Sequence, residues 1–449
     1  MSAPTDPPPA APGQGVAAAL AALFGVTGLG SAAVAVSLPV LADSLDATPG
    51  RAALVVSAYA LSLAVGSAVM GRLGDIYGIR RPLVTGLVVM VVAASVGATV
   101  DSLPALIAAR VVQGLGASAI PALTLAAVHS RFAGAGRDRA MATYSGVGAT
   151  VNALGPVIGA MIVGPLGWRP VVAIPVASLL VLPVVWSALP STPEPDARLD
   201  LPGAALVGIA ASGAILALQF ATLGPTIAVA GLVALLIAAP WAVARSRWRP
   251  EGIITAAMVT HPTARRSLFT AVSLSSAWFG MLVAIPTRLA DAGWSGVQIG
   301  LILVPSAVLG LVASRITSPM LARFGLVRSQ LVALTGSTLA LCLAAVGAAA
   351  VSAPPLVLAT LTLMLSFGLG QPAMSGLIAD AVPARTRGGA LGLMTLFFLA
   401  GGSLGAAVVG GLTSQIGTTG SLLVLAIIPA LGALSFVGPS RRALTAPTG

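Results

Sequence analysis

The chain has 449 residues, of which 57% are hydrophobic and only 8% are charged. A soluble domain carries about 25% charged residues, so this composition excludes a soluble protein and indicates one that crosses a membrane many times. With a single cysteine, Cys342, the chain has neither a disulfide framework nor a cysteine-based metal site. The net charge of +11 would suit a nucleic-acid partner, but the positions of the basic residues argue against one.

All 23 basic residues are arginines, and 18 of them fall in loops, tails or span edges on one predicted side of the membrane. Three fall on the other side, and two, Arg110 and Arg315, fall within spans. An excess of arginine marks the cytoplasmic side of a membrane protein. We therefore expect a multi-pass protein of the cell (inner or plasma) membrane with both termini in the cytoplasm, the lipid bilayer as a partner and no nucleic acid.

Residues 1–15 are rich in proline and alanine, and we expect a disordered tail. The apolar runs that follow predict about fourteen membrane-spanning helices, each close to the length that crosses about 30 Å of hydrocarbon. Their predicted limits are 16–40, 52–70, 83–100, 104–128, 141–164, 170–189, 203–222, 225–244, 266–288, 297–316, 328–349, 355–377, 388–412 and 420–437.

An internal repeat groups these spans. Arg137-x-Arg139 recurs as Arg385-x-Arg387, and Tyr77-Gly78 is echoed by Phe324-Gly325 at almost the same offset. The fold expected is all-α: two six-helix bundles with an inserted two-helix hairpin. The expected segments are a bundle at 16–190, a cytoplasmic linker at 191–202, the hairpin at 203–244, a basic linker at 245–265, a second bundle at 266–438 and a cytoplasmic tail at 439–449.

A short charged segment, Gly71-Arg-Leu-Gly-Asp-Ile-Tyr-Gly-Ile-Arg-Arg81, joins two uncharged runs. Its glycines, Gly71, Gly74 and Gly78, are expected to let the chain turn sharply. Three arginines, Arg72, Arg80 and Arg81, place the segment on the cytoplasmic side. The acid of the segment is Asp75.

This pattern resembles the loop G-x-L-[GA]-D-x-x-G-x-R-R between helices 2 and 3 of the major facilitator superfamily. The resemblance implies that Asp75 lies at the N-terminus of a helix of the other half, here the span that starts near Gly388, and holds the cytoplasmic face shut. Arg139 is expected to join this cluster. The repeat places Ala322 at the position equivalent to Asp75, so the acidic contact is expected in one half only.

The fourth predicted span carries Arg110, Gln113 and Gly114. An arginine inside a span costs about 3 kcal/mol on insertion scales, so it either faces a wet cavity or a partner, or reaches back to the outer headgroups. Arg110 and Gln113 are one turn apart on one helix face. The segment resembles the R-x-x-Q-G motif of the superfamily, in which the arginine is proposed to aid proton transfer.

The fifth span carries Gly148, Gly155, Pro156 and Gly159. The three glycines share one face, where small residues let a neighbouring helix approach closely, and Pro156 bends the helix. This resembles the G-x6-G-P-x2-G-G motif of drug:proton antiporters, with Ala160 in place of the last glycine. With fourteen predicted spans, the chain resembles the fourteen-helix drug exporter branch over nearly its whole length, and the bent surface is thought to favour export.

One feature departs from that branch. An aspartate is usual inside the first span, but Gly30 occupies its position, and no Asp or Glu lies within any predicted span. The two histidines, His129 and His261, fall in predicted cytoplasmic loops. Three alternatives remain for coupling: a facilitator, a relative that has lost transport, or proton coupling through an acid at the outer edge, namely Asp43, Asp46 or Asp101.

The candidate substrate cavity holds polar and aromatic residues in five different spans: Tyr59, Asn152, Gln219, Trp278 and Gln371. Each is also a residue type that packs between membrane helices. Together they suggest an uncharged or weakly cationic amphipathic substrate, while Arg110 keeps an anionic one open.

We therefore expect a monomeric secondary active transporter that exports small amphipathic compounds, drugs or metabolites, by alternating access. Its partners would be a small-molecule substrate, protons in the coupled alternative, and lipid. Other readings of the same fold are a non-transporting sensor or scaffold, and a facilitator or importer of a small solute. The sequence shows no nucleophile–base cluster, so we do not expect an enzyme. It also shows no motif for a metal or a cofactor.

Overall fold

The computed structural model describes residues 14–189, 200–218, 224–249, 252 and 254–436, and every regular element in them is a helix. The N-terminal part comprises α1 (Gln14–Ser44), α2 (Pro49–Tyr77), α3 (Arg80–Gly97), α4 (Leu103–Ala117), α5 (Ala119–Arg131), α6 (Gly134–Ala153), α7 (Gly155–Leu166), α8 (Arg169–Ala173), the 3-10 helix η1 (Ile174–Leu180) and α9 (Leu182–Ala188). The rest comprises α10 (Leu201–Leu218), α12 (Pro225–Trp248), α13 (Ala256–Thr260), α14 (Pro262–Asp291), α15 (Gly296–Ala350), α16 (Ala353–Ala381), η2 (Ala384–Thr386) and α17 (Arg387–Leu434).

Within the described residues, 11 helices are long and apolar enough to cross a membrane. Two of them, α15 with 55 residues and α17 with 48, are far longer than one crossing requires. A straight helix of 55 residues would be about 80 Å long, against about 30 Å of hydrocarbon. Both are interrupted by a glycine with positive φ, Gly325 at 70° and Gly417 at 71°, so each consists of two helical stretches joined at that glycine.

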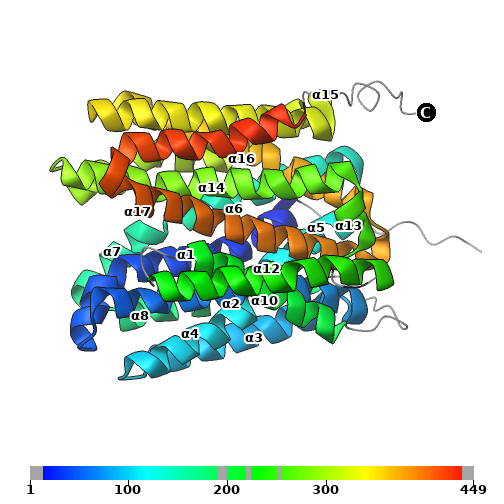
Figure 1. The fold of residues 1–449 in the computed structure, drawn as a ribbon, viewed down its shortest axis with the longest axis horizontal. Coiled ribbons are helices and arrows are strands. Elements are labelled where there is room, and N and C mark those ends of the chain that lie inside the picture. Colours follow the sequence, from blue (N-terminus) through cyan, green and yellow to red (C-terminus); the bar gives the residue numbers. More distant parts are fainter. Residues whose placement is uncertain (1–13, 190–199, 219–223, 250–251, 253, 437–449) are drawn as a thin grey trace, which may run out of the picture.

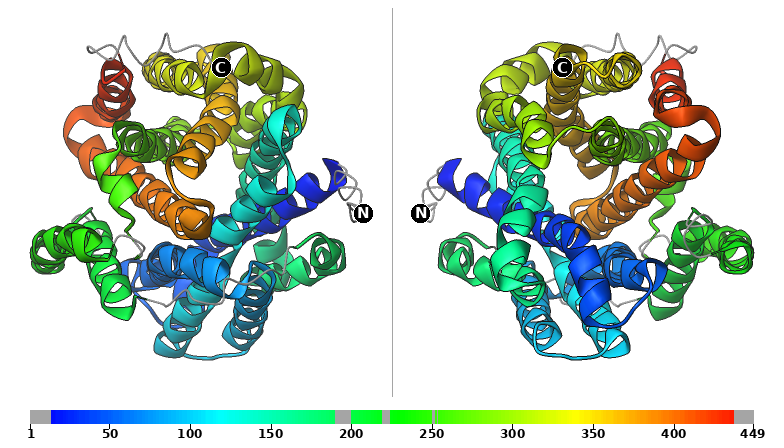
Figure 2. Two further views of the ribbon diagram at one scale, coloured as in Figure 1. Left: turned by 90° about the vertical axis from the view of Figure 1, so that its right-hand side faces the viewer. Right: turned by 90° about the vertical axis from the view of Figure 1, so that its left-hand side faces the viewer.

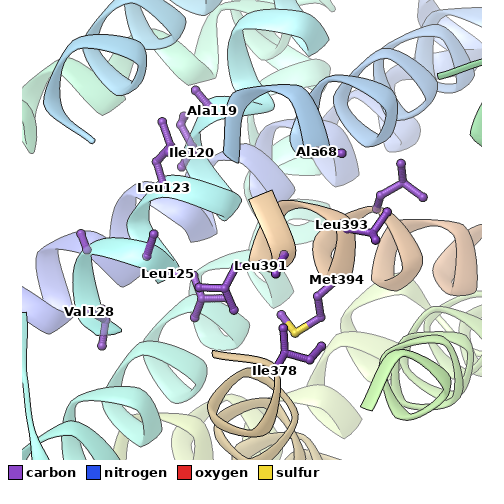
Figure 3. Close-up of a cluster of buried hydrophobic side chains, with 14 of the residues drawn as sticks. Ala68, Ala119, Ile120, Leu123, Leu125, Val128, Ile378, Leu391, Leu393 and Met394 are labelled. Carbon is purple, nitrogen blue, oxygen red and sulfur yellow. The ribbon is translucent and has the colours of Figure 1, made fainter. Parts of the chain in front are cut away.

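The helices lie side by side along their length (Figure 1) and form two groups. Figure 2 shows α1–α9 gathered on one side of the molecule and α14–α17 on the other, with the pair α10–α12 at the periphery. We call the end of the bundle at which α2 ends the Asp75 end, and the other the far end. The buried apolar core beside the Asp75 end draws on both groups: Ala68 of α2 and Leu123 of α5 share it with Ile378 of α16 and Met394 of α17 (Figure 3).

Two sets of contacts hold the peripheral pair α10–α12 together, one along the helices and one at their end. Gly213 of α10 and Gly231 of α12 let the two backbones meet, because a Cβ on either would collide with the other helix. At one end Arg245 donates two hydrogen bonds from Nε and Nη2 to Asp200, which also accepts from the Gly203 N–H. Burial acts to raise the pKa of Asp200, but these hydrogen bonds outweigh it and hold the pKa of that carboxyl below its usual range.

Candidate functional site

Asp75 lies in the last turn of α2 and contacts the first residues of α17. Its two carboxylate oxygens accept hydrogen bonds from the backbone N–H groups of Gly388, at 2.7 Å, and Gly389, at 2.8 Å. The first N–H groups of a helix have no partner within it, and the positive end of its dipole attracts an anion. The predicted contact between Asp75 and the helix that starts near Gly388 is therefore present, while its role in gating stays a prediction.

The cation beside Asp75 is Arg72 from the preceding turn of α2. Its Nη1 lies 3.6 Å from the Asp75 carboxylate and donates to the Arg385 carbonyl at 3.0 Å. The Arg72 side chain is only 4% exposed, so this charge is removed from water together with that of Asp75. Arg139, which was expected here, lies exposed on α6. Sequence reasoning assigned Arg72 to membrane orientation alone and missed this contact.

Two of the three glycines in this segment have a different use from the one predicted. α2 continues through Gly71 and Gly74 to Tyr77, and the turn itself falls on Gly78, whose φ is 77°. Gly71 packs on the Gly388 backbone, where a Cβ would collide with the carbonyl oxygen, and Gly74 packs on Leu123. The first two glycines therefore allow close helix packing, and only Gly78 turns the chain as expected.

Further contacts join the two groups at this end. Ser67 Oγ donates to the Gly392 carbonyl at 3.2 Å, one turn from Gly71 on α2 and one turn from Gly388 on α17. Arg137 of α6 lies 3.9 Å from Asp380 of α16, at a half-exposed position. The predicted loop arginines are placed apart from Asp75: the Arg80 guanidinium stacks 3.5 Å above the Trp186 ring and Arg81 is exposed.

Arg110 is buried inside the N-terminal group, at 1% exposure, and does not reach the headgroups. Its Nε donates to the Val55 carbonyl at 3.1 Å and its Nη1 to Gln113 Oε1 at 2.8 Å, while the guanidinium lies 4.2 Å from the centre of the Tyr59 ring. Gly114 permits this arrangement, because a Cβ there would collide with the Tyr59 backbone and separate α4 from α2.

The small-residue face of the fifth predicted span packs on α1. Gly148 contacts Phe24, while a Cβ at Gly155 or Gly159 would press into the α1 backbone. The helix is also interrupted as expected: α6 ends at Ala153, and α7 begins at Gly155 with Pro156 in its first turn. These contacts let the backbones of α1 and α6–α7 approach each other closely.

The candidate cavity residues fall in different environments. Tyr59 is buried and donates its hydroxyl to the Thr27 carbonyl, and Asn152 packs against Gly28. Trp278 lies 5.2 Å from Phe367, which meets Phe398 at 5.9 Å, and this cluster also contacts Ala149 of the N-terminal group. Gln371 is buried with its Oε1 unpaired, and Gln219 lies outside the described residues. The two phenylalanines were missed because aromatic residues inside a span are ordinarily core residues.

The carboxylates and histidines of the described chain lie near helix ends. Because the helices are longer than the predicted spans, Asp75, Asp138, Asp291 and Asp380 lie in or next to terminal turns, and no carboxylate lies midway along a helix in the described chain. His129 was expected in a loop but lies buried in the last turn of α5, with both ring nitrogens unpartnered. Across the described residues no three His, Cys, Asp or Glu side chains gather as a metal site requires.

Comparison with known proteins identifies the family. The model of the Major Facilitator Superfamily matches residues 20–370 and, in a second match, 267–449. The chain belongs to the major facilitator superfamily. It is therefore a multi-span membrane protein of a transporter family.

Relatives and solved structures agree with this assignment. The chain is 28% identical to the uncharacterized transporter YebQ of Escherichia coli (strain K12), over 89% of each chain. It is 30% identical to the cephamycin export protein CmcT of Amycolatopsis lactamdurans, over 65% of this chain and 62% of that one. The crystal structure of the human organic anion transporter MFSD10 (TETRAN) shares the fold with a TM-score of 0.67, at 16% identity, over 95% of this chain and 100% of that one.

Proposed function

We propose that this member of the superfamily is a secondary active transporter that exports small amphipathic compounds by alternating access. The observation that supports it best is the pair of hydrogen bonds between Asp75 and the N-terminus of α17. They connect the two helix groups through one carboxylate and two backbone N–H groups, so they can break and re-form without refolding either group. Such a contact suits a gate better than a permanent core interface.

The membrane arrangement proposed has fourteen spans. In it α15 and α17 each cross twice, with reversals at Gly325 and Gly417, α4–α5 and α6–α7 are single bent spans, and α8–α9 is a further span. The arginine excess assigns the Asp75 end to the cytoplasm. The described conformation is then one in which the cytoplasmic side is closed, and export proceeds by opening this side to load substrate.

Two observations support export over import. The Gly148–Gly159 face, which resembles that of drug:proton antiporters, packs on α1 as such a motif requires. One relative is named as a cephamycin export protein. Proton coupling is proposed through the far end, where Asp43 and Asp46 are exposed and Asp101 pairs with Arg169.

The test is efflux from cells that express the protein, measured with a neutral, a cationic and an anionic amphipathic dye. The proposal predicts faster efflux of at least one dye than from cells that express the Asp75→Asn variant at the same membrane level. A protonophore then separates the coupled alternative, which loses efflux, from a facilitator, which keeps the rate set by the dye gradient. Efflux from both strains that is no faster than from cells without the protein, for all dyes, contradicts the proposal and favours a sensor or scaffold.

A further inference from the structure

Arg110 and Gln113 carry two hydrogen-bond donors that nothing in the described chain accepts. Arg110 Nη2 and Gln113 Nε2 are both buried and without a partner. The two residues are 1% and 0% exposed, so bulk water does not satisfy these groups in this conformation. A buried donor without a hydrogen-bond partner costs about 1–3 kcal/mol of stability, and more when the donor is cationic. The pair is therefore incomplete without an acceptor.

The two free donors are held together by the contact that orients them. A guanidinium has no acceptor atom, so the Gln113 amide must present its oxygen to Arg110 Nη1, and its NH2 group is left for another partner. Val55 and the Tyr59 ring fix the guanidinium plane on its other sides. The free donors thus belong to two planar groups joined by one hydrogen bond.

The chain does not compensate the charge of Arg110. In the described residues, the arginines that pair with a carboxylate are Arg72, Arg137, Arg169 and Arg245, and Arg110 is not among them. Related exporters are expected to carry an acid at the position of Gly30. A Cβ at Gly30 would lie 3.1 Å from the ring of Pro175 in η1. The missing acceptor is therefore one that also carries negative charge.

The geometry points to Arg110 and Gln113 as the binding site for the carboxylate of an amphipathic organic acid. A carboxylate has two acceptor oxygens, one for Arg110 Nη2 and one for Gln113 Nε2, and it also supplies the missing negative charge. That this acid is the transported compound rests on the proposed function. Arg110 lies about 10 Å along α4 from its first residue at the far end, so an exported acid that loads when the Asp75 end opens would leave this site toward the far end.

The experiment measures binding to the purified full-length protein. The probe is 1-pyrenebutyrate, its methyl ester is the uncharged control, and sodium chloride is the inorganic competitor. We expect the acid to bind at least about tenfold more tightly than the ester, a difference typical of charge-assisted bidentate contacts.

The decisive variant is Gln113→Glu, which replaces the free amide NH2 by a carboxylate oxygen and gives Arg110 an internal anion at almost unchanged side-chain volume. It is expected to weaken acid binding at least about tenfold and to leave ester binding unchanged. Gln298→Glu, the same change at the exposed first turn of α15, is the matched control and keeps acid binding. Arg110→Gln removes the cation and is expected to abolish the preference for the acid.

Equal binding of acid and ester, or undiminished acid binding by Gln113→Glu, overturns the proposal. Displacement of the acid by equimolar chloride overturns it as well, since an inorganic anion then fills the site. A fatty acid that co-purifies with the wild type but not with Gln113→Glu supports the carboxylate site and identifies the membrane as its source. Efflux of a neutral dye without any acid binding retains the proposed function and removes this site, whereas acid binding without efflux of any dye does the reverse.

Discussion

Two regions of the bundle bury charged side chains and treat them differently. At the Asp75 end, a carboxylate, a guanidinium and two helix N-terminal N–H groups satisfy one another, and the partners come from both helix groups. Around Arg110, the partners in the described chain come from α2 and α4, and two donors have no hydrogen-bond acceptor. Because the hydrogen-bond partners of Asp75 lie on the other helix group, its carboxylate is satisfied only when the two groups are in contact at this end. A charge that the chain leaves unsatisfied requires something from outside.

The largest effect is expected from Asp75→Asn. An amide can accept from one of the two N–H groups, but its own NH2 then faces the other, so one charged hydrogen bond is lost and one donor is left unmet. A loss of about 1.5–3 kcal/mol in the closed state corresponds to roughly a ten- to hundredfold change in the gate equilibrium. We expect export to fall at least about tenfold with normal membrane insertion. Asp291→Asn, the same change at an exposed far-end position for which no coupling role is proposed, is the control and should export normally.

Gly71→Ala tests the same end by a steric route. A Cβ at Gly71 would collide with the Gly388 carbonyl, so α2 and α17 are forced apart although every charge is retained. We expect export to fall severalfold, and less than with Asp75→Asn because the helices can shift slightly. The control is Gly410→Ala on α17, where no atom lies within 4 Å of the added methyl, and it should leave export unchanged. Normal export by Gly71→Ala would show that the close packing is dispensable for the cycle.

Gln113→Glu tests the opposite treatment of charge around Arg110. Adding a carboxylate to a satisfied core destabilises a protein, but here it meets an unpaired cation and an unmet donor. We expect a gain of about 1–2 kcal/mol, seen as a higher Tm of the purified protein than for the wild type. A lower Tm would show that the site is already compensated, and the contrast between the two regions would fail.

Asp380→Asn is expected to have the smallest effect. Its ion pair with Arg137 also joins the two helix groups, but the Asp380 side chain is 50% exposed and the two charged atoms are 3.9 Å apart. A solvated pair of this kind contributes less than about 1 kcal/mol. Export is therefore expected to stay within about fivefold of the wild type. A loss as large as that of Asp75→Asn would mean that the burial of Asp75 is not what distinguishes it.

Much of the Asp75 end could be predicted from the sequence. The loop pattern named Asp75, and the repeat placed a helix start near Gly388, because both depend on sequence spacing. The use of Gly71 could not be predicted, since a glycine that permits a turn and one that permits helix packing look alike until the facing backbone is known. Arg72 was missed for the same reason: its partner is a carbonyl 313 residues away.

The Arg110 region shows a different limit. From the sequence, Arg110 lay close enough to a span boundary to reach the headgroups, and only the packing of Gly114 on α2 places it inside. His129 was assigned to a loop because the apolar run ends before it, but α5 continues to Arg131 and buries the ring. Hydropathy measures the length of the apolar run, whereas tertiary contacts extend the helix beyond it.

The most direct test is the distance across the Asp75 end. Spin labels at Tyr77 of α2 and Arg323 of α15, both exposed, report it in a Cys342→Ala background. The account predicts one narrow, short distance for the otherwise wild-type protein and a second, longer population when Asp75→Asn is added. An identical distribution in both proteins would contradict it, because the carboxylate would then not hold the two helix groups together.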